Sequence, residues 1–175
     1  MIEKYFEGKV PSLPEGAFEK GSAIDTAREA QLMRLVAEGT KGEYDAAMER
    51  LRFSHALGKV WAIISDANRC IEETAPWTLW KEGKKEKLAV TLYTLAESLR
   101  IVAVYLSPFI PHTAQEMWRQ LGSEADITSL SMEDALRWGG LKAGTKVTKG
   151  PSLFPKVEAP LPKNEPPTPK VEADV

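Results

Sequence analysis

Residues 60–81 read VWAIISDANRCIEETAPWTLWK, and this stretch joins the two strongest apolar periodicities of the chain. On each side of it, apolar residues recur at alternating steps of four and three, which places them on one side of a long helix. Two long helices with a short connection are expected to pack antiparallel in a bundle. The first series is Phe53, Leu57, Val60, Ile64, Ala67 and Ile71, and the second is Leu88, Leu92, Leu95, Leu99, Val102 and Leu106.

The remaining segments before residue 140 also favour helix. Ser22 with Asp25 nearly forms a capping box, and Gly39 suits a helix end. Pro111 is suited to the first position of a further helix that ends at Gly122. The sequence shows no alternating pattern typical of strands, so the predicted fold is an all-α antiparallel helix bundle. Helices are expected at about 22–39, 41–73, 84–106 and 111–122, with a short helical turn near 131–136.

The N-terminal residues leave two interpretations open. Ile2, Tyr5 and Phe6 have helical spacing, and Gly8 and Pro11 follow as stop signals. So short a helix is not stable alone, and its apolar side chains must dock on something. Either a frayed helical turn caps the bundle, or the chain begins inside a longer helix whose first turns are absent.

The C-terminal stretch differs in composition, since seven of the 12 prolines lie within residues 151–175. Proline alternates there with lysine and glutamate, and such a segment cannot bury enough apolar surface to order itself. We expect a disordered, extended tail that acts as a linker rather than as a docking motif. The predicted organisation is a helical bundle at 1–142, followed by a C-terminal segment and Pro-rich linker at 143–175.

Composition excludes several classes of function. The 175 residues carry a net charge of −2, so any nucleic-acid partner must be met by a local patch. The single cysteine, Cys70, excludes an internal disulfide, and His55 and His112 are the only histidines. No glycine-rich phosphate loop and no GxSxG elbow occurs. No apolar run approaches the roughly 18 residues of a membrane span, and the charged N-terminus does not read as a signal peptide. We expect a soluble protein of a reducing compartment that lacks catalytic residues and metal ligands.

The corner after the first long helix is the strongest candidate for a binding site. Pro76 cannot continue the helix and presents Trp77 and Trp80 at the connection between the two long helices. Trp77 either caps the core or offers an exposed indole on which nucleic-acid bases stack. The following KEGKKEK has a local charge of +2, which suits phosphate groups beside stacked bases. Its lysines, the candidate phosphate contacts, are Lys81, Lys84, Lys85 and Lys87.

Longer segments resemble a known family. ANRCIEETAPWTLWK (67–81) and ESLRIVAVYLSPFIPHTAQEMWRQLG (97–122) are similar to the anticodon-binding helical bundle of bacterial methionyl-tRNA synthetases, which are class I enzymes. The opening MIEKYFEGKVP and the late TKVTKGPSLFPKVE are similar as well, so the resemblance covers Met1 to about Glu158. Isoleucyl, valyl, leucyl and cysteinyl enzymes share a related bundle, but Ala-Pro-Trp favours the methionine enzyme.

The resemblance implies a role for individual residues. Trp77 falls on the tryptophan that stacks on the anticodon, where CAU is read. Glu72 falls where the family places an acidic residue that helps to reject other anticodons. Asn68 matches an asparagine that we interpret as a structural hydrogen-bonding residue near the site, with Pro76 as the second structural residue. Cys70 departs from the tyrosine often found at its position.

The resemblance also implies what this chain does not contain. The family reads the anticodon with an Asn and an Arg on the preceding helix, and it carries HIGH-like and KMSKS-like signatures and a zinc-bearing insertion in a catalytic domain. We therefore expect a fragment that is inactive alone and holds no cofactor, with ATP and zinc bound by the absent domain.

The expected partners are the methionine tRNA and the catalytic domain of the same enzyme, in the cytoplasm and without a membrane. A homodimer would form through an absent C-terminal domain. Weak RNA binding by the fragment is predicted. The alternative is a helical adaptor domain with no RNA role, whose apolar groove accepts a partner helix.

Overall fold

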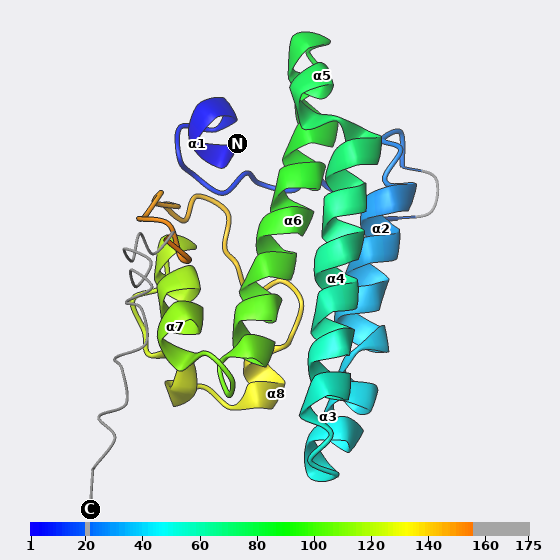
Figure 1. Cartoon of the computed structure of the whole chain (residues 1–175). Helices are drawn as coiled ribbons and strands as arrows, with labels where there is room; N and C mark the ends of the chain where they lie inside the picture. Colours follow the sequence, from blue (N-terminus) through cyan, green and yellow to red (C-terminus); the bar gives the residue numbers. More distant parts are fainter. Residues whose placement is uncertain (20–21, 156–175) are drawn as a thin grey trace, which may run out of the picture.

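The centre of the computed structural model is α6 (Lys85–Leu106), against which the other long helices pack (Figure 1). The structure describes residues 1–19 and 22–155. From Leu88 to Leu106 every α6 residue is buried except Leu99, which is 43% exposed. By length and composition alone α6 could cross a membrane, contrary to the sequence expectation, but 94% of its most apolar window is buried in the protein. This burial is the pattern of a core helix.

The other helices surround α6 on two sides (Figure 1). On one side lie α2 (Ala27–Arg34), its π-helical continuation η1 (Leu35–Gly39), α3 (Lys41–Glu49) and α4 (Phe53–Thr74). On the other side lie α7 (Pro111–Gln120), the 3₁₀ turn η2 (Ile127–Ser129) and α8 (Met132–Ala135), while α1 (Ile2–Tyr5) and α5 (Pro76–Lys81) occupy one end. Residues 1–19 and 22–155 contain no strand, only an isolated bridge between Lys9 and Lys146. The predicted all-α bundle is confirmed.

Helix α4 is rotated relative to the prediction. Its buried residues share one face, but Val60 and Ala67 are the only members of the predicted apolar series among them, and Phe53 is exposed. The reason is that α4 packs against α6 on one side and against α2 and α3 on another, so its buried arc is centred between them. The buried residues are Ala56, Val60, Ile63, Ala67 and Cys70.

Two predicted helices have different boundaries. The expected helix at 41–73 is interrupted between α3 and α4, where Leu51 adopts a left-handed φ of 56° that no α-helix continues. The expected helix from Ser22 begins only at Ala27. Ser22 and Asp25 instead accept hydrogen bonds from backbone N–H groups two residues on and form short turns before it. The predicted end at Gly39 is confirmed, as are the starts at Lys84 to Lys85 and at Pro111.

The segments near the two ends of the described chain lie side by side. The N–H of Val10 donates to the Thr145 carbonyl at 2.9 Å, and the N–H of Val147 donates to the Gly8 carbonyl at 2.7 Å. Ile2, Tyr5 and Phe6 of the N-terminal turn pack half-buried against the core. Residues beyond 142 therefore continue along the bundle, and most of the predicted Pro-rich tail, 156–175, lies outside the described residues.

A buried carboxylate fastens the segment after α8 to α6. Glu97 is fully buried, and its oxygens accept three backbone N–H bonds, from Gly139, Gly140 and Leu141, at 2.7 to 2.9 Å. Arg100 forms an ion pair with the same carboxylate at 2.8 Å. The guanidinium also donates to the carbonyls of Ala135 and Arg137. We call these residues the Glu97 clamp.

Candidate nucleic-acid interface

The corner between α4 and α6 is built on a left-handed residue and a proline. Helix α4 ends at Thr74, and Ala75 has φ 43° and ψ 68°, which turns the chain away from the helix axis. Pro76 then opens α5 at its first position, as predicted, and is buried. Leu79, the other buried residue of α5, docks in the main core. This short helix is thus held by one face only.

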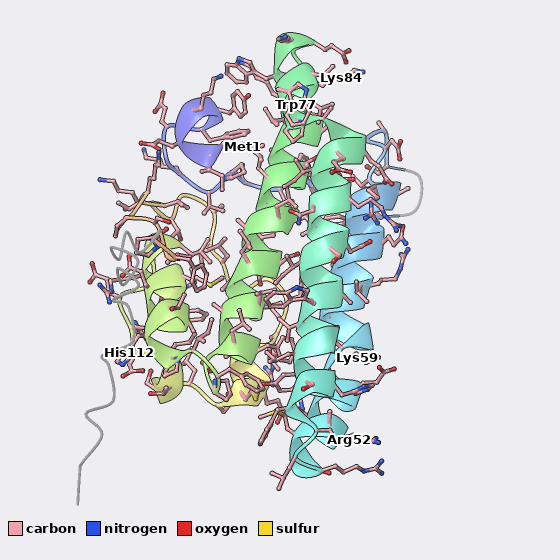
Figure 2. All side chains as sticks on the ribbon, viewed as in Figure 1. Met1, Arg52, Lys59, Trp77, Lys84 and His112 are labelled. Atoms are coloured by element: carbon pink, nitrogen blue, oxygen red, sulfur yellow. The ribbon has the colours of Figure 1, made fainter. Side chains whose placement is uncertain are left out.

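The two indoles of α5 lie on a neighbouring, exposed face of the helix. Trp77 is 46% exposed and Trp80 is 42% exposed. Pro76 and Leu79, rather than Trp77, close the core at this point. Figure 2 shows Trp77 and Lys84 together at the end of the bundle, with Met1 nearby, whereas Arg52 lies at the opposite end. The geometry leaves Trp77 free to contact a partner.

Trp80 has an aromatic neighbour that the sequence analysis did not identify. Its ring lies 5.1 Å from that of Tyr5 in α1, centroid to centroid, with the planes tilted by 32°. The ammonium of Lys4 is 5.4 Å from the Tyr5 ring centroid. The helical spacing of Tyr5 indicated that it docks, but only the fold shows that it docks beside Trp80.

The predicted lysines have different surroundings. Lys81, Lys84 and Lys85 are all exposed. Lys84 forms an ion pair with Glu82 at 2.8 Å, and among the described residues Lys81 and Lys85 have no acidic partner within ion-pair distance. Lys81 and Lys85 are therefore uncommitted within the described residues, and Lys84 is exposed but paired with Glu82.

Lys87 is a correction to the predicted phosphate contacts. Its ammonium forms an ion pair at 2.6 Å with Glu29, which is fully buried in α2. It also donates to the backbone carbonyl of Asp25, and Thr91 donates to the same Glu29 carboxylate at 2.5 Å. Because a buried carboxylate must keep its partner, Lys87 joins α2 to α6 instead of facing a ligand.

Glu72 and Asn68 are both exposed on α4. Among the described residues neither side chain makes a hydrogen bond or ion pair, so the structure does not show the hydrogen-bonding role expected of Asn68. The neighbouring Glu73, by contrast, is bound by Arg28 at 2.8 Å, and Arg28 also pairs with Asp66 at 2.7 Å. Glu72 is thus an uncommitted carboxylate two residues before the helix end.

An open cleft of about 850 Å³ lies beside α5, between the start of α2, the end of α4 and the start of α6. Its charged lining is mixed, with lysines and Arg28 facing Asp25, Glu73 and Glu86. The cleft is therefore not strongly positive, and neither Trp77 nor Trp80 is among the residues that line it.

Side chains suited to catalysis are scarce in the described part of the chain. No group of three or more His, Cys, Asp and Glu residues within it is placed to hold a metal ion. Cys70 is a buried core residue, and burial raises the pKa of its thiol to about 12, so the thiol stays protonated near neutral pH. His112 is exposed at the start of α7.

Comparison with known proteins identifies the family. A family model described as the anticodon binding domain of methionyl tRNA ligase matches residues 18–162. The chain belongs to this family. It is 40% identical over 159 residues to the methionine–tRNA ligase of Caldanaerobacter subterraneus subsp. tengcongensis, and 42% identical over 160 residues to that of Bacillus subtilis. These alignments cover 90% and 91% of the chain but 23% and 22% of the two ligases.

The fold agrees with the same family. The crystal structure of the apo form of Mycobacterium tuberculosis methionyl-tRNA synthetase superposes on the chain with a TM-score of 0.75 and 25% sequence identity. The superposition covers 91% of the chain and 30% of the synthetase. This chain is thus an anticodon-binding domain of the methionyl-tRNA ligase family, and it spans about a fifth to a third of the proteins it matches.

Proposed function

We propose that this anticodon-binding domain recognises the CAU anticodon of the methionine tRNA, with Trp77 as its main contact. The observation that carries the proposal is the exposed indole on α5, held outward because Pro76 and Leu79 fill the core in its place. An indole face stacks on any unstacked base, and the anticodon loop presents such bases.

Selectivity and positioning come from the surrounding charges. Lys81, Lys84 and Lys85 are exposed beside the indoles and meet backbone phosphates. Glu72 is exposed on α4 and forms no ion pair within residues 1–19 and 22–155, and we propose that it accepts from a cytosine amino group and repels acceptor edges of other bases. Stacking thus supplies affinity, and Glu72 supplies discrimination.

The rest of the reaction belongs to other parts of a methionine–tRNA ligase. We propose that the catalytic domain of the same enzyme is the second partner, that it binds ATP and zinc, and that this chain alone does not activate methionine. A homodimer would form through a further C-terminal domain. Translation places the protein in the cytoplasm, in keeping with its bacterial relatives.

A binding experiment with the 175-residue chain tests the function. Fluorescence anisotropy is measured with a labelled CAU anticodon stem-loop and with a stem-loop of unrelated triplet. We expect weak, salt-sensitive binding that prefers CAU. Trp77→Ala should weaken it roughly 10- to 100-fold, because stacking is worth about 1–3 kcal/mol per base.

Trp61→Ala is the matched control. Trp61 is 60% exposed on α4, and the 13 residues that separate it from Thr74 place it about 20 Å from the corner. Its replacement should leave RNA binding unchanged. Equal affinity of the Trp77→Ala variant and the unsubstituted chain for the CAU loop would disprove the assignment.

A second candidate function rests on a different surface. An apolar groove of about 430 Å³ runs over α6, where its lining includes Leu92, Leu95 and Leu99, and residues of α1, α4, α7 and the 147–153 segment complete it. Such a groove suits an amphipathic partner helix, which is the adaptor function. Sedimentation of the chain separates the two candidates: self-association removed by Leu99→Glu, without any RNA binding, would favour the adaptor.

A further inference from the structure

We propose that Trp80, backed by Tyr5, is a second base-stacking platform, which takes the anticodon-loop nucleotide adjacent to the one on Trp77. The inference rests on the proposed function and adds a second contact to the same site. The interface then contacts two nucleotides through α5 and α1, rather than one nucleotide through a single exposed indole.

The two indoles lie on one helix. Trp77 and Trp80 are three residues apart in α5, so their Cβ atoms lie about 5–6 Å apart on the same side of the helix. The buried face of α5 is formed by Pro76 and Leu79. Stacked nucleotides of one strand repeat about every 3.4 Å, so neighbouring bases can reach both rings.

Trp80 is held in place by an aromatic neighbour. Tyr5 contacts it with a centroid distance of 5.1 Å, and Tyr5 itself is half-buried against the core. Aromatic pairs of this kind stabilise each other beyond the effect of their buried area. An indole that is already packed on one side loses less side-chain freedom when a base stacks on it. Since Trp80 is still 42% exposed, part of its surface remains open to a base.

The charge around this aromatic pair is positive. Lys4 lies 5.4 Å from the Tyr5 ring centroid, and Lys81 follows Trp80 directly in α5. Both lysines are exposed, and neither has an acidic partner within ion-pair distance among the described residues. Aromatic rings flanked by uncommitted ammonium groups suit a single-stranded polynucleotide, whereas an apolar peptide would leave these charges without a counterpart.

The test scans the anticodon loop with abasic nucleotides. Labelled CAU stem-loops, each lacking one loop base in turn, are titrated with the 175-residue chain and its Trp77→Ala, Trp80→Ala and Trp80→Phe variants. We expect Trp80→Ala to weaken binding about 10-fold and Trp80→Phe to recover most of it. Removal of one particular loop base should no longer weaken RNA binding by the Trp80→Ala variant. This base should be adjacent to the base whose removal no longer weakens binding by the Trp77→Ala variant.

Three outcomes overturn the inference, and they differ in what they say about the proposed function. Unchanged affinity of Trp80→Ala, with the CAU preference intact, would remove the second platform and leave the function standing. A second outcome is that Trp80→Ala binds RNA weakly, Trp80→Phe does not recover the affinity, and every abasic stem-loop still binds Trp80→Ala less tightly than the intact one. This outcome would show that Trp80 only packs α1 against α5. No CAU preference in the unsubstituted chain would remove the function and this inference together. Thermal melting and Trp61→Ala control for folding and for the loss of an exposed indole.

Discussion

At the scale of single residues, two lysines separated by one position have opposite roles. Lys85 is exposed at the start of α6, while Lys87 is bound to the buried carboxylate of Glu29. In the sequence both lysines belong to one basic run. Which of them turns inward depends on the direction of its side chain around the start of the helix, which composition does not show. The number of lysines in the sequence near a site can therefore exceed the number that a ligand can contact.

A pair of substitutions distinguishes these roles. Lys87→Met should reduce the free energy of unfolding by about 3 kcal/mol, because it leaves Glu29 buried without its cation. Lys85→Met should change stability by less than about 0.5 kcal/mol and should weaken RNA binding instead. Urea unfolding and stem-loop anisotropy on both variants measure the contrast. A stable Lys87→Met variant with weakened RNA binding would restore Lys87 to the phosphate contacts.

Cys70 makes stability depend on alkaline pH. Burial raises its thiol pKa from the usual 9.0 to about 12, so the folded state keeps the proton that the unfolded chain releases. The stabilisation is complete below pH 9 and is lost as the pH rises from about 9 toward 12. At pH 10 the loss is about 1 kcal/mol.

The measurement is urea unfolding of the chain and of Cys70→Ala between pH 8 and pH 10. The unsubstituted chain should lose stability over this interval more steeply than Cys70→Ala. The pKa of Tyr44 is also raised by burial, from 10.0 to about 12, and it contributes to both proteins alike. Identical slopes for the two proteins would mean that the thiol titrates with its ordinary pKa in the folded state.

At the scale of elements, left-handed residues set where helices end. Leu51 separates α3 from α4 with φ 56°, and Ala75 separates α4 from α5 with φ 43°. Neither is glycine or asparagine, so no local sequence signal marked the first of these corners. The second was predictable because a proline follows it, and Pro76 forbids continuation of α4.

Relief of this backbone conformation should be measurable. Leu51 is exposed, so Leu51→Gly removes little packing while it removes the cost of a left-handed non-glycine residue. We expect the free energy of unfolding to rise by about 0.5–1 kcal/mol. Leu130→Gly is the control, because exposed Leu130 has an extended backbone and should lose stability. Thermal melting of both variants measures the difference. A lower melting temperature for Leu51→Gly than for the unsubstituted chain would contradict the expected stabilisation.

At the scale of the whole molecule, the helical periodicity predicted the fold class and the two long helices between residues 53 and 106, but not which neighbours cover each face of them. Leu99 belongs to the predicted apolar series of α6, yet it is exposed in the groove. Phe53 is exposed for a similar reason, since α4 turns a different arc toward its neighbours. The spacing of apolar residues defines one apolar side of a helix. Which part of the helix surface is buried depends on how many other helices pack around it.

The candidate site was predictable in part for the same reason. Trp77 and Pro76 were recognisable from their local sequence, because a proline after a long helix forces a corner. The Tyr5 contact to Trp80 joins residues 75 positions apart in the chain, and the Glu29 contact to Lys87 joins residues 58 apart. Such contacts have no signature in a single sequence.

The Glu97 clamp ties distant parts of the chain together and should be costly to break. Glu97→Gln keeps the shape of the side chain but removes the charge that Arg100 and three N–H groups bind, so we expect a loss of about 3 kcal/mol. Gly140→Ala should also destabilise, since a Cβ there would lie 2.7 Å from the Arg100 guanidinium carbon.

Urea unfolding quantifies both clamp variants, and limited trypsin digestion at Arg137 reports on local opening. Glu124→Gln is the control, since Glu124 is exposed and outside the clamp. Cleavage at Arg137 should accelerate in the clamp variants and not in the control. Unchanged cleavage and stability would show that the segment is held by its apolar contacts alone.

The pairing of residues 8–10 with 144–147 has a consequence for chain connectivity. Because these two segments already lie side by side, the packing of the bundle does not require the helices to follow one another in their present order along the chain. A circular permutant that joins residue 155 to residue 1 and opens the chain at the exposed corner 50–52 would retain every helix and the α5 surface. Its RNA affinity would then report on the packed bundle alone, independent of where synthesis begins.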